Sequence, residues 1–285
     1  MFCYDTKNIA VKSFYLCHMQ LQEILKDVKS VALEVGTFIE NERKNFDSNI
    51  VQEKSPNQLV SYVDIEAEKQ IIQGLSAILP QAGFIGEEAT HNSEQKEYTW
   101  VIDPLDGTTN FVHNLPVFCI SIGLLHQNKP ILGVIYEPNR KELFYASENS
   151  GAFLNNRNIR VTQTETLQRT LLATGFPYYD FDKVRAFLNV LDYLMKNTRG
   201  LRRMGSAAVD LAYTACGRFD GFFEYGLSPW DVAAGACIVK EAGGIVCDFR
   251  NGNDFLFGKE IIACNTQIAL SLVPFISKQF HPTND

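Results

Sequence analysis

Cysteine pairs of the kind that build a disulfide frame or a zinc site are missing from this sequence. The 285 residues contain seven cysteines, an odd number, and no two of them are spaced as Cys-x-x-Cys. Cysteines scattered in this way are typical of reduced thiols inside the cell. The beginning of the chain also has no long apolar stretch, so we expect no signal peptide, no membrane-spanning helix and a cytoplasmic location.

Positive charge is scarce as well. The chain has 26 Lys and Arg against 33 Asp and Glu, a formal net charge of −7 at pH 7. Binding along a nucleic-acid backbone needs clustered basic residues, so we expect no nucleic-acid polymer and no membrane as a partner. With 46% hydrophobic residues the chain is otherwise typical of a globular protein, and its length fits one large domain or two moderate ones.

Hydrophobic periodicity predicts the elements of the first third of the chain. Apolar residues recur every three or four positions over 21–39, which indicates an amphipathic helix. We expect a short strand over 59–63 and a second helix that Asp64 caps and Pro80 ends. Short extended runs follow at 83–86 and 98–102, and both stop at acidic residues.

The pattern changes in the second half of the chain. Apolar segments separated by short turns over 117–154 predict an antiparallel meander, whereas strand-like and helix-like segments alternate from there on. This change predicts an α+β part over 19–155 and an α/β part over 156–285. Residues 1–18 precede a second methionine and are treated as an N-terminal extension, whose place in the native protein is left open.

The most informative stretch is Asp103-Pro104-Leu105-Asp106-Gly107-Thr108-Thr109-Asn110-Phe111. An extended run leads into it, Pro104 is expected to end that run, and Gly107 permits a tight turn. If a helix begins at Thr108, its unpaired amides would bind a phosphate while Asp103 and Asp106 hold cations against it. Alternatively, the two aspartates are turn formers and Thr108 is a helix cap.

Two further acidic segments favour the metal interpretation. Glu87 follows an apolar run in Gly86-Glu87-Glu88, and Asp231 stands at the start of a small-residue helix in Trp230-Asp231-Val232-Ala233-Ala234-Gly235. Hard oxygen ligands from separate loops are what Mg²⁺ needs, with water and phosphate oxygens completing the octahedron. The sequence therefore predicts a magnesium site that also binds phosphate.

Together these three segments resemble the signature motifs of the inositol monophosphatases, in the same order and at similar separations. The likeness runs from about Met19 almost to the C-terminus. It implies an α+β fold, a layered α/β/α/β/α sandwich of the sugar phosphatase type with the site between its two parts. It also implies two or three Mg²⁺ ions, held by Glu87, Asp103, Asp106, Asp231 and the backbone carbonyl of Leu105.

The resemblance extends to the water and the substrate. Asp64 matches the position that works with Thr108 to orient the attacking water, so the implied catalytic residues are Asp64, Glu87 and Thr108. The implied substrate-binding residues are Asp106, Gly107, Thr108, Gly205, Ser206, Ala207, Glu224 and Asp231, of which Glu224 would accept hydrogen bonds from ring hydroxyls.

The chain differs from many relatives near the mobile loop of the family. Lys54 falls where that loop often has a lysine near the third metal, and is otherwise a solvated loop charge. Gln58 stands where many relatives have Asp, just before the Leu-Val-Ser segment. Arg202 and Arg203 precede Gly205, as in bacterial-type relatives. We expect these differences to affect substrate choice.

The implied activity is hydrolysis of a phosphate monoester, first of all myo-inositol monophosphate to inositol and phosphate, by direct attack of a metal-activated water without a phosphoenzyme. Relatives of the same fold act on fructose 1,6-bisphosphate, NADP, histidinol phosphate or adenosine 3′,5′-bisphosphate, and the sequence leaves this choice open. Lithium sensitivity and a homodimer are implied by the resemblance alone.

Two other classes of protein are alternatives to this interpretation. Haloacid dehalogenase phosphatases use a nucleophile motif D-x-D-G-T, but the two acids here are three positions apart, which disfavours that class. A metal-dependent sugar-phosphate sensor or regulatory partner is the non-catalytic alternative. His113 and the other histidines have no triad or metal-site spacing.

Overall fold

The computed structural model describes residues 6–44, 46, 52–55, 58–88, 96–177 and 181–282, with side chains described from residue 20 onward except over 52–55 and 58–60. The predicted role of Lys54 and the difference at Gln58 therefore lie outside the described side chains. Of the described helices, none combines the length and the apolar character needed to cross a lipid bilayer.

A mixed sheet occupies the first half of the molecule. Its strand order is β3 (Gly83–Gly86), β4 (Tyr98–Asp106), β5 (Cys119–His126), β6 (Lys129–Glu137), β7 (Glu142–Ser147), β8 (Ala152–Leu154) and β9 (Arg157–Ile159). Only β3 and β4 pair in parallel among these strands, and each later strand pairs antiparallel with the one before it. The predicted antiparallel meander is confirmed.

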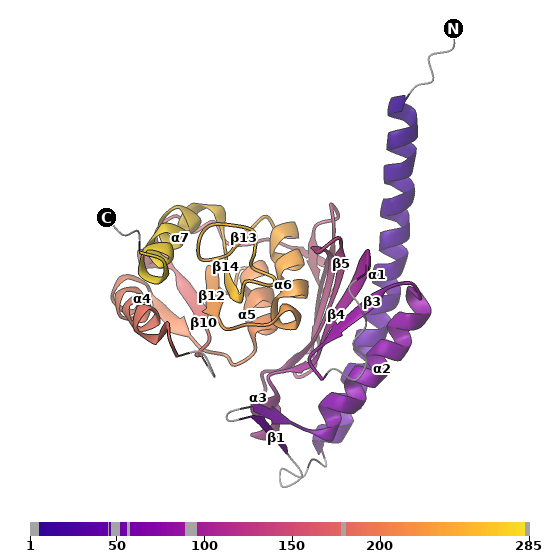
Figure 1. The fold of residues 1–285 in the computed structure, drawn as a ribbon, viewed down its shortest axis with the longest axis horizontal. Helices are drawn as coiled ribbons and strands as arrows, with labels where there is room; N and C mark the ends of the chain where they lie inside the picture. The colour runs from indigo at the N-terminus through magenta and orange to yellow at the C-terminus, as the bar shows by residue number, and fades with distance from the viewer. Residues whose placement is uncertain are drawn as a thin grey trace.

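Two long helices cover one face of this sheet (Figure 1). They are α1 (Thr6–Lys44) and α2 (Tyr62–Ile78), and a buried cluster that includes Val28, Ile71 and Trp100 joins them to the strands. The periodicity over 21–39 thus predicted the packed part of α1 correctly. The N-terminal part of α1 projects beyond the body of the molecule (Figure 1).

The second half of the chain forms a smaller sheet in the order β11 (Gly200–Arg202), β10 (Leu171–Thr174), β12 (Gly221–Tyr225), β14 (Glu260–Cys264) and β13 (Ile245–Cys247). Helices α5 (Ala207–Ala215) and α6 (Pro229–Glu241) pack between the two sheets, and α4 (Val184–Asn197) and α7 (Thr266–Phe280) cover the outer face of the smaller one (Figure 1). This arrangement is the predicted α/β/α/β/α sandwich.

Short elements complete the description. A hairpin of β1 (Gln52–Ser55) and β2 (Gln58–Val60) precedes α2, α3 (Thr108–Val112) follows β4, and a 3₁₀ turn, η2 (Leu167–Arg169), precedes β10. The predicted boundary at 155/156 lies in the turn between β8 and β9, which belong to one sheet. The division into two parts stays a proposal.

The start of α2 corrects one prediction. The strand expected over 59–63 ends at Val60, and Ser61 rather than Asp64 is the N-cap of α2. The Ser61 hydroxyl accepts a hydrogen bond from Val63 N, while the Asp64 carboxylate accepts one from Ser61 N. This capping box satisfies two amides at once, so Tyr62 and Val63 are drawn into the first helical turn.

Pro104 corrects a second prediction, because β4 does not stop before it but continues to Asp106. The pairing of β4 with β5 is regular up to Asp103 and resumes at Asp106, with an irregularity between the two. A proline cannot donate to a strand ladder, and a bulge is where a strand tolerates it.

Helix α6 lies unusually close to the larger sheet, at a pair of facing glycines. Gly123 of β5 and Gly133 of β6 are cross-strand partners. A Cβ atom at Gly133 would lie 2.3 Å from the Ala234 carbonyl oxygen, and one at Gly123 would lie 2.9 Å from the Ala233 Cβ. The two glycines therefore set the depth at which α6 sits against the strands.

This contact gives a stability prediction. Gly133→Val should lower the free energy of unfolding by about 3 kcal/mol, because the group it meets is backbone and cannot rotate away. Urea unfolding followed by circular dichroism measures the effect. Lys129→Val, at an exposed position of the same strand, is the matched control and should change stability by less than about 0.5 kcal/mol. Equal effects of the two substitutions would contradict the packing argument.

Candidate metal and phosphate site

The bulge in β4 brings two carboxylates to one face of the larger sheet. Val101 faces the core on the side of α5 and α6, whereas Ile102 and Leu105 belong to the core on the side of α1 and α2. Strict alternation along a strand would place Leu105 on the same side as Val101. The irregularity between Asp103 and Asp106 shifts the alternation by one residue, so that both aspartates lie on the α5 and α6 side.

A third carboxylate comes from the start of α6. Pro229 occupies the first turn, and Asp231 Oδ2 accepts a hydrogen bond of 2.7 Å from Ser228 N. Ser121 Oγ of β5 donates to the Trp230 carbonyl over 3.2 Å, and Ser121 is the cross-strand partner of Asp103. This contact fixes the first turn of α6 beside the aspartate of β4.

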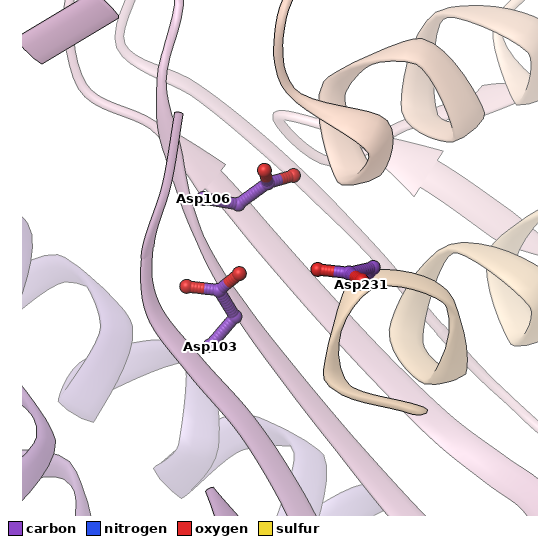
Figure 2. Close-up of side chains that lie close together, drawn as sticks. All are labelled: Asp103, Asp106 and Asp231. Carbon is purple, nitrogen blue, oxygen red and sulfur yellow. The ribbon is translucent and has the colours of Figure 1, made fainter. Parts of the chain in front are cut away.

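Asp103, Asp106 and Asp231 each offer a carboxylate oxygen, and these oxygens lie within 4.8 Å of one another. Figure 2 shows the three side chains directed into one small space between the strand and the helix. The Leu105 amide fixes Asp103 by donating to its Oδ1 over 2.9 Å. Protein hydrogen bonds thus hold the carboxylates in place without neutralising them.

The electrostatics of this cluster favour a bound cation. Burial raises the pKa of Asp103 well above its ordinary value, and the neighbouring Glu87 raises it further. Burial likewise raises the pKa of Asp231, with Asp106 as the next cause. Burial raises the pKa of Asp106 to about 6, although the Ala208 amide and the Ser206 hydroxyl oppose the shift. Closely spaced hard oxygen donors with this need for positive charge suit a divalent metal ion.

Glu87 lies on the same pocket, just beyond the end of β3. Its amide donates to the Ile102 carbonyl over 3.2 Å, which ties it to β4. The buried Glu68 of α2 accepts a hydrogen bond from Glu88 N over 3.1 Å. A Cβ at Gly86 would lie 2.1 Å from Glu68 Oε1, so this close approach requires glycine.

Asp64 and Thr108 form a unit behind the cluster. The Thr108 hydroxyl lies 2.8 Å from Asp64 Oδ1 and 3.0 Å from the Leu105 carbonyl, and both oxygens are acceptors. Asp64 is fully buried and also accepts hydrogen bonds from the amide and hydroxyl of Ser61. Burial raises the pKa of Asp64, although these hydrogen bonds oppose the shift. The capping box of α2 therefore positions Asp64 toward the Thr108 hydroxyl.

Hydrogen bonds connect the turn at Gly107, which precedes α3, to the turn at Gly205, which precedes α5. Gly107 has φ of 102° and Gly205 has φ of 90°, a left-handed backbone that favours glycine at both turns. The Asn110 amide group donates to the Val117 carbonyl over 2.7 Å and to the Met204 carbonyl over 2.9 Å. At the start of α5, the Ser206 hydroxyl and Ala208 N donate to Asp106 Oδ2 over 2.8 and 2.7 Å.

Glu224 lies at the far side of the pocket, near the end of β12. It is buried, and a Cβ at Gly175 would lie 1.9 Å from its Oε1. The pKa of Glu224 is raised to about 8, first by burial and then by the neighbouring Asp106, although Arg203 opposes the shift. The carboxyl group is thus held among acidic neighbours with one arginine nearby.

One pocket collects nearly all residues that the sequence singled out. Its lining includes Glu87, Asp103, Leu105, Asp106, Gly107, Thr108, Gly205, Ser206, Ala207, Glu224 and Asp231, and Asp64 lies behind Thr108. His113 is exposed at the end of α3 and does not line the pocket.

Arg203, which the sequence analysis expected to affect substrate choice, lines the pocket, and its guanidinium lies 5.7 Å from the centroid of the Phe176 ring. Phe176 itself lines the pocket and was not predicted from the sequence. Asp210 of α5 also lines it, although it drew no attention in the sequence. All nine residues of α5 are buried, and Asp210 is the only charged one. A single carboxylate within a run of small and apolar residues was the signal that could have found it.

Comparisons with known proteins agree with this architecture. A model of the inositol monophosphatase family matches residues 20–278. The chain is 40% identical to the Nus factor SuhB of Pseudomonas aeruginosa (92% of this chain, 99% of the relative) and 38% identical to an inositol-1-monophosphatase of Mesorhizobium japonicum (91% and 98%). An inositol monophosphatase structure from Anabaena superposes with a TM-score of 0.79 at 36% identity, covering 90% of this chain and 96% of the other.

The raised pKa values predict how pH affects the metal-free protein. Asp106 and Glu224 titrate at about 6 and about 8 in the folded state against ordinary values of 3.8 and 4.5. The folded state therefore binds protons that the unfolded state releases. Their contribution to stability is full below about pH 4 and is lost as the pH rises toward about 8. The free energy of unfolding in EDTA should fall between about pH 5 and about pH 8.

Magnesium should reverse this loss, because a bound cation replaces the protons. Urea unfolding at both pH values, with Mg²⁺ or with sodium chloride of equal ionic strength, tests the expectation. The stabilisation by Mg²⁺ should be larger at the higher pH. An equal effect of the two salts would show that the carboxylates do not form a specific cation site.

Proposed function

The chain belongs to the inositol monophosphatase family, and we propose that it is a metal-dependent phosphatase that hydrolyses a phosphate monoester of a small polyol. The convergence of Asp103, Asp106 and Asp231 carries the proposal. We propose myo-inositol monophosphate as the first substrate, because the Mesorhizobium and Anabaena proteins are named as inositol monophosphatases. Other phosphate esters handled by this fold are the alternatives.

The cation site is assigned to the acidic side chains of the pocket. Glu87, Asp103, Asp106 and Asp231 would hold two or three Mg²⁺ ions, together with the backbone carbonyl of Leu105. When bound, these ions would neutralise the phosphate charge and make water a stronger nucleophile. All four side chains are hard oxygen donors, which agrees with Mg²⁺ and disfavours softer metals.

We assign the orientation of the attacking water to Thr108 and Asp64. The Thr108 hydroxyl has one proton, and both nearby acceptors, Asp64 Oδ1 and the Leu105 carbonyl, compete for it. Because that proton is engaged in a hydrogen bond, the lone pairs of the hydroxyl are left to accept a hydrogen bond from water. The pair would therefore turn the oxygen of the water toward phosphorus.

The remaining residues would bind the ester. The turn at Gly107 and the first amides of α3, from Thr108 onward, would contact the phosphate. Gly205, Ser206 and Ala207 line the other wall and would contact the alcohol part, with Glu224 accepting from its hydroxyls. A homodimer, lithium sensitivity and a cytoplasmic location stay predictions.

A regulatory role is the second candidate, because the Pseudomonas relative is named as a Nus factor rather than as an enzyme. A protein with a regulatory role alone would not hydrolyse phosphate esters. Hydrolysis therefore separates the two candidates.

The test of the proposed function is phosphate release from a panel of esters with and without Mg²⁺. We expect release that requires Mg²⁺, incorporates oxygen-18 from solvent water, and falls by about 100-fold or more in Asp103→Asn. Asp192→Asn, an exposed carboxylate of α4, is the matched control and should retain full activity. A panel without any hydrolysis, or a fully active Asp103→Asn, would refute the assignment. Beryllium fluoride trapped on Asp103 would instead indicate a phosphoenzyme.

The contact between Thr108 and Asp64 predicts non-additive effects. Thr108→Val and Asp64→Asn should each lower kcat by about 100-fold with little change in KM, because each removes the orientation of the same water. The double variant should be no slower than the slower single variant. Steady-state kinetics of the three variants measure the coupling. Multiplicative losses would mean that the two residues act independently.

A further inference from the structure

Asp210 is a buried carboxylate for which the fold gives no structural reason. It exposes 1% of its surface, lines the pocket, and no described group forms a hydrogen bond with its Oδ1. Its own amide donates to the Ser206 carbonyl, but that bond serves the helix and not the side chain. Burying a polar group without a partner costs stability, so a group left in this state at a pocket suggests a ligand.

Two structural roles can be set aside. Asp210 does not cap α5, because Ser206 is the N-cap and accepts from Val209 N. It is also absent from the group of carboxylates within 4.8 Å of one another. Among the charged neighbours of Asp210, Glu224 has the largest effect on its pKa, ahead of Asp106 of the cation site.

The surroundings of Asp210 define what it can bind. Burial raises the pKa of Asp210 well above its ordinary value, Glu224 and Asp106 raise it further, and Arg203 lowers it. A phosphate would be repelled by this acidic wall, and an ammonium group would meet Arg203. A neutral hydroxyl suits the site, because it can donate to a carboxylate and accept from a carboxylic acid.

We propose that Asp210 binds a hydroxyl of the alcohol part of the ester, next to the hydroxyl bound by Glu224, and so selects polyol phosphates over esters without hydroxyls. The inference rests on the proposed function and deepens it. Asp210 and Glu224 together would form hydrogen bonds with two hydroxyls on one side of the substrate. Asp210 is thus a specificity-determining residue rather than part of the chemical step.

The experiment compares two esters, myo-inositol 1-phosphate and p-nitrophenyl phosphate, which has no hydroxyl on its ring. In Asp210→Ala the ratio of kcat/KM for the first ester to that for the second should fall about tenfold, mainly through KM. Asp210→Asn keeps a donor and an acceptor and should restore most of the ratio. Loss of the same factor on both esters, or an unchanged ratio, would overturn the proposal.

Asp220 supplies the matched control. It is also a buried aspartate with an unpartnered Oδ1, and its Oδ2 accepts from Leu171 N over 2.7 Å, but it does not line the pocket. Asp220→Ala should therefore leave the ratio within about twofold of the wild-type value. If the ratio falls equally in the Asp220 variant, the loss of any buried carboxylate in this half of the protein has the same effect. That result would refute a contact between Asp210 and the substrate.

A binding measurement separates this inference from the proposed function. Calorimetry of myo-inositol 1-phosphate, with Ca²⁺ in place of Mg²⁺, should give a Kd about tenfold weaker for Asp210→Ala than for the wild type. Binding that depends on Asp210 without any turnover would refute the phosphatase and support the contact. Turnover with an unchanged selectivity ratio in Asp210→Ala would support the phosphatase and refute the contact. A wild-type protein that binds no polyol phosphate would overturn the contact as well.

Discussion

The electrostatic repulsion among three buried carboxylates is the constraint that the rest of this structure has to satisfy. Asp103, Asp106 and Asp231 come from a strand and a helix that are far apart in the sequence, and each is fixed by a protein donor: Leu105 N, Ala208 N or Ser228 N. Packing and hydrogen bonds hold carboxylate oxygens of these three residues within 4.8 Å of one another. Such a cluster is stable at neutral pH only with protons or cations among its oxygens.

The packing of α6 determines whether the cluster forms. Ala234 sits on Gly133, and Asp231 is one turn earlier in the same helix. The Ser121 contact to the Trp230 carbonyl fixes the rotation of that first turn. Two glycines and one serine of the sheet therefore decide where the third carboxylate lies. Stability and ligand binding share these residues, which explains why a core position such as Gly133 bears on the site.

Much of this could be predicted from the sequence, and the failures have physical causes. The resemblance of the motifs implied the five-layer fold, and Glu87, Asp103, Asp106 and Asp231 of those motifs do line one pocket. The extent of β4 was wrong because a proline is excluded from a regular strand but tolerated in a bulge. The cap of α2 was misplaced because Ser61 and Asp64 satisfy each other's amides. Asp210 was missed because no motif contains it, although a lone carboxylate within the buried run of α5 was a signal.

The two hydrogen bonds of Asn110 have a consequence for how this pocket diversifies. The short Asn110 side chain donates to both the Val117 carbonyl and the Met204 carbonyl. These two hydrogen bonds connect the segment after the metal-facing aspartates to the loop that would face the alcohol. Lengthening the second loop to admit a bulkier alcohol would pull on the first. New substrate preferences should therefore arise by exchanging side chains on a fixed frame, at places such as Phe176 and Arg203, and not by inserting residues between Arg203 and Ala207.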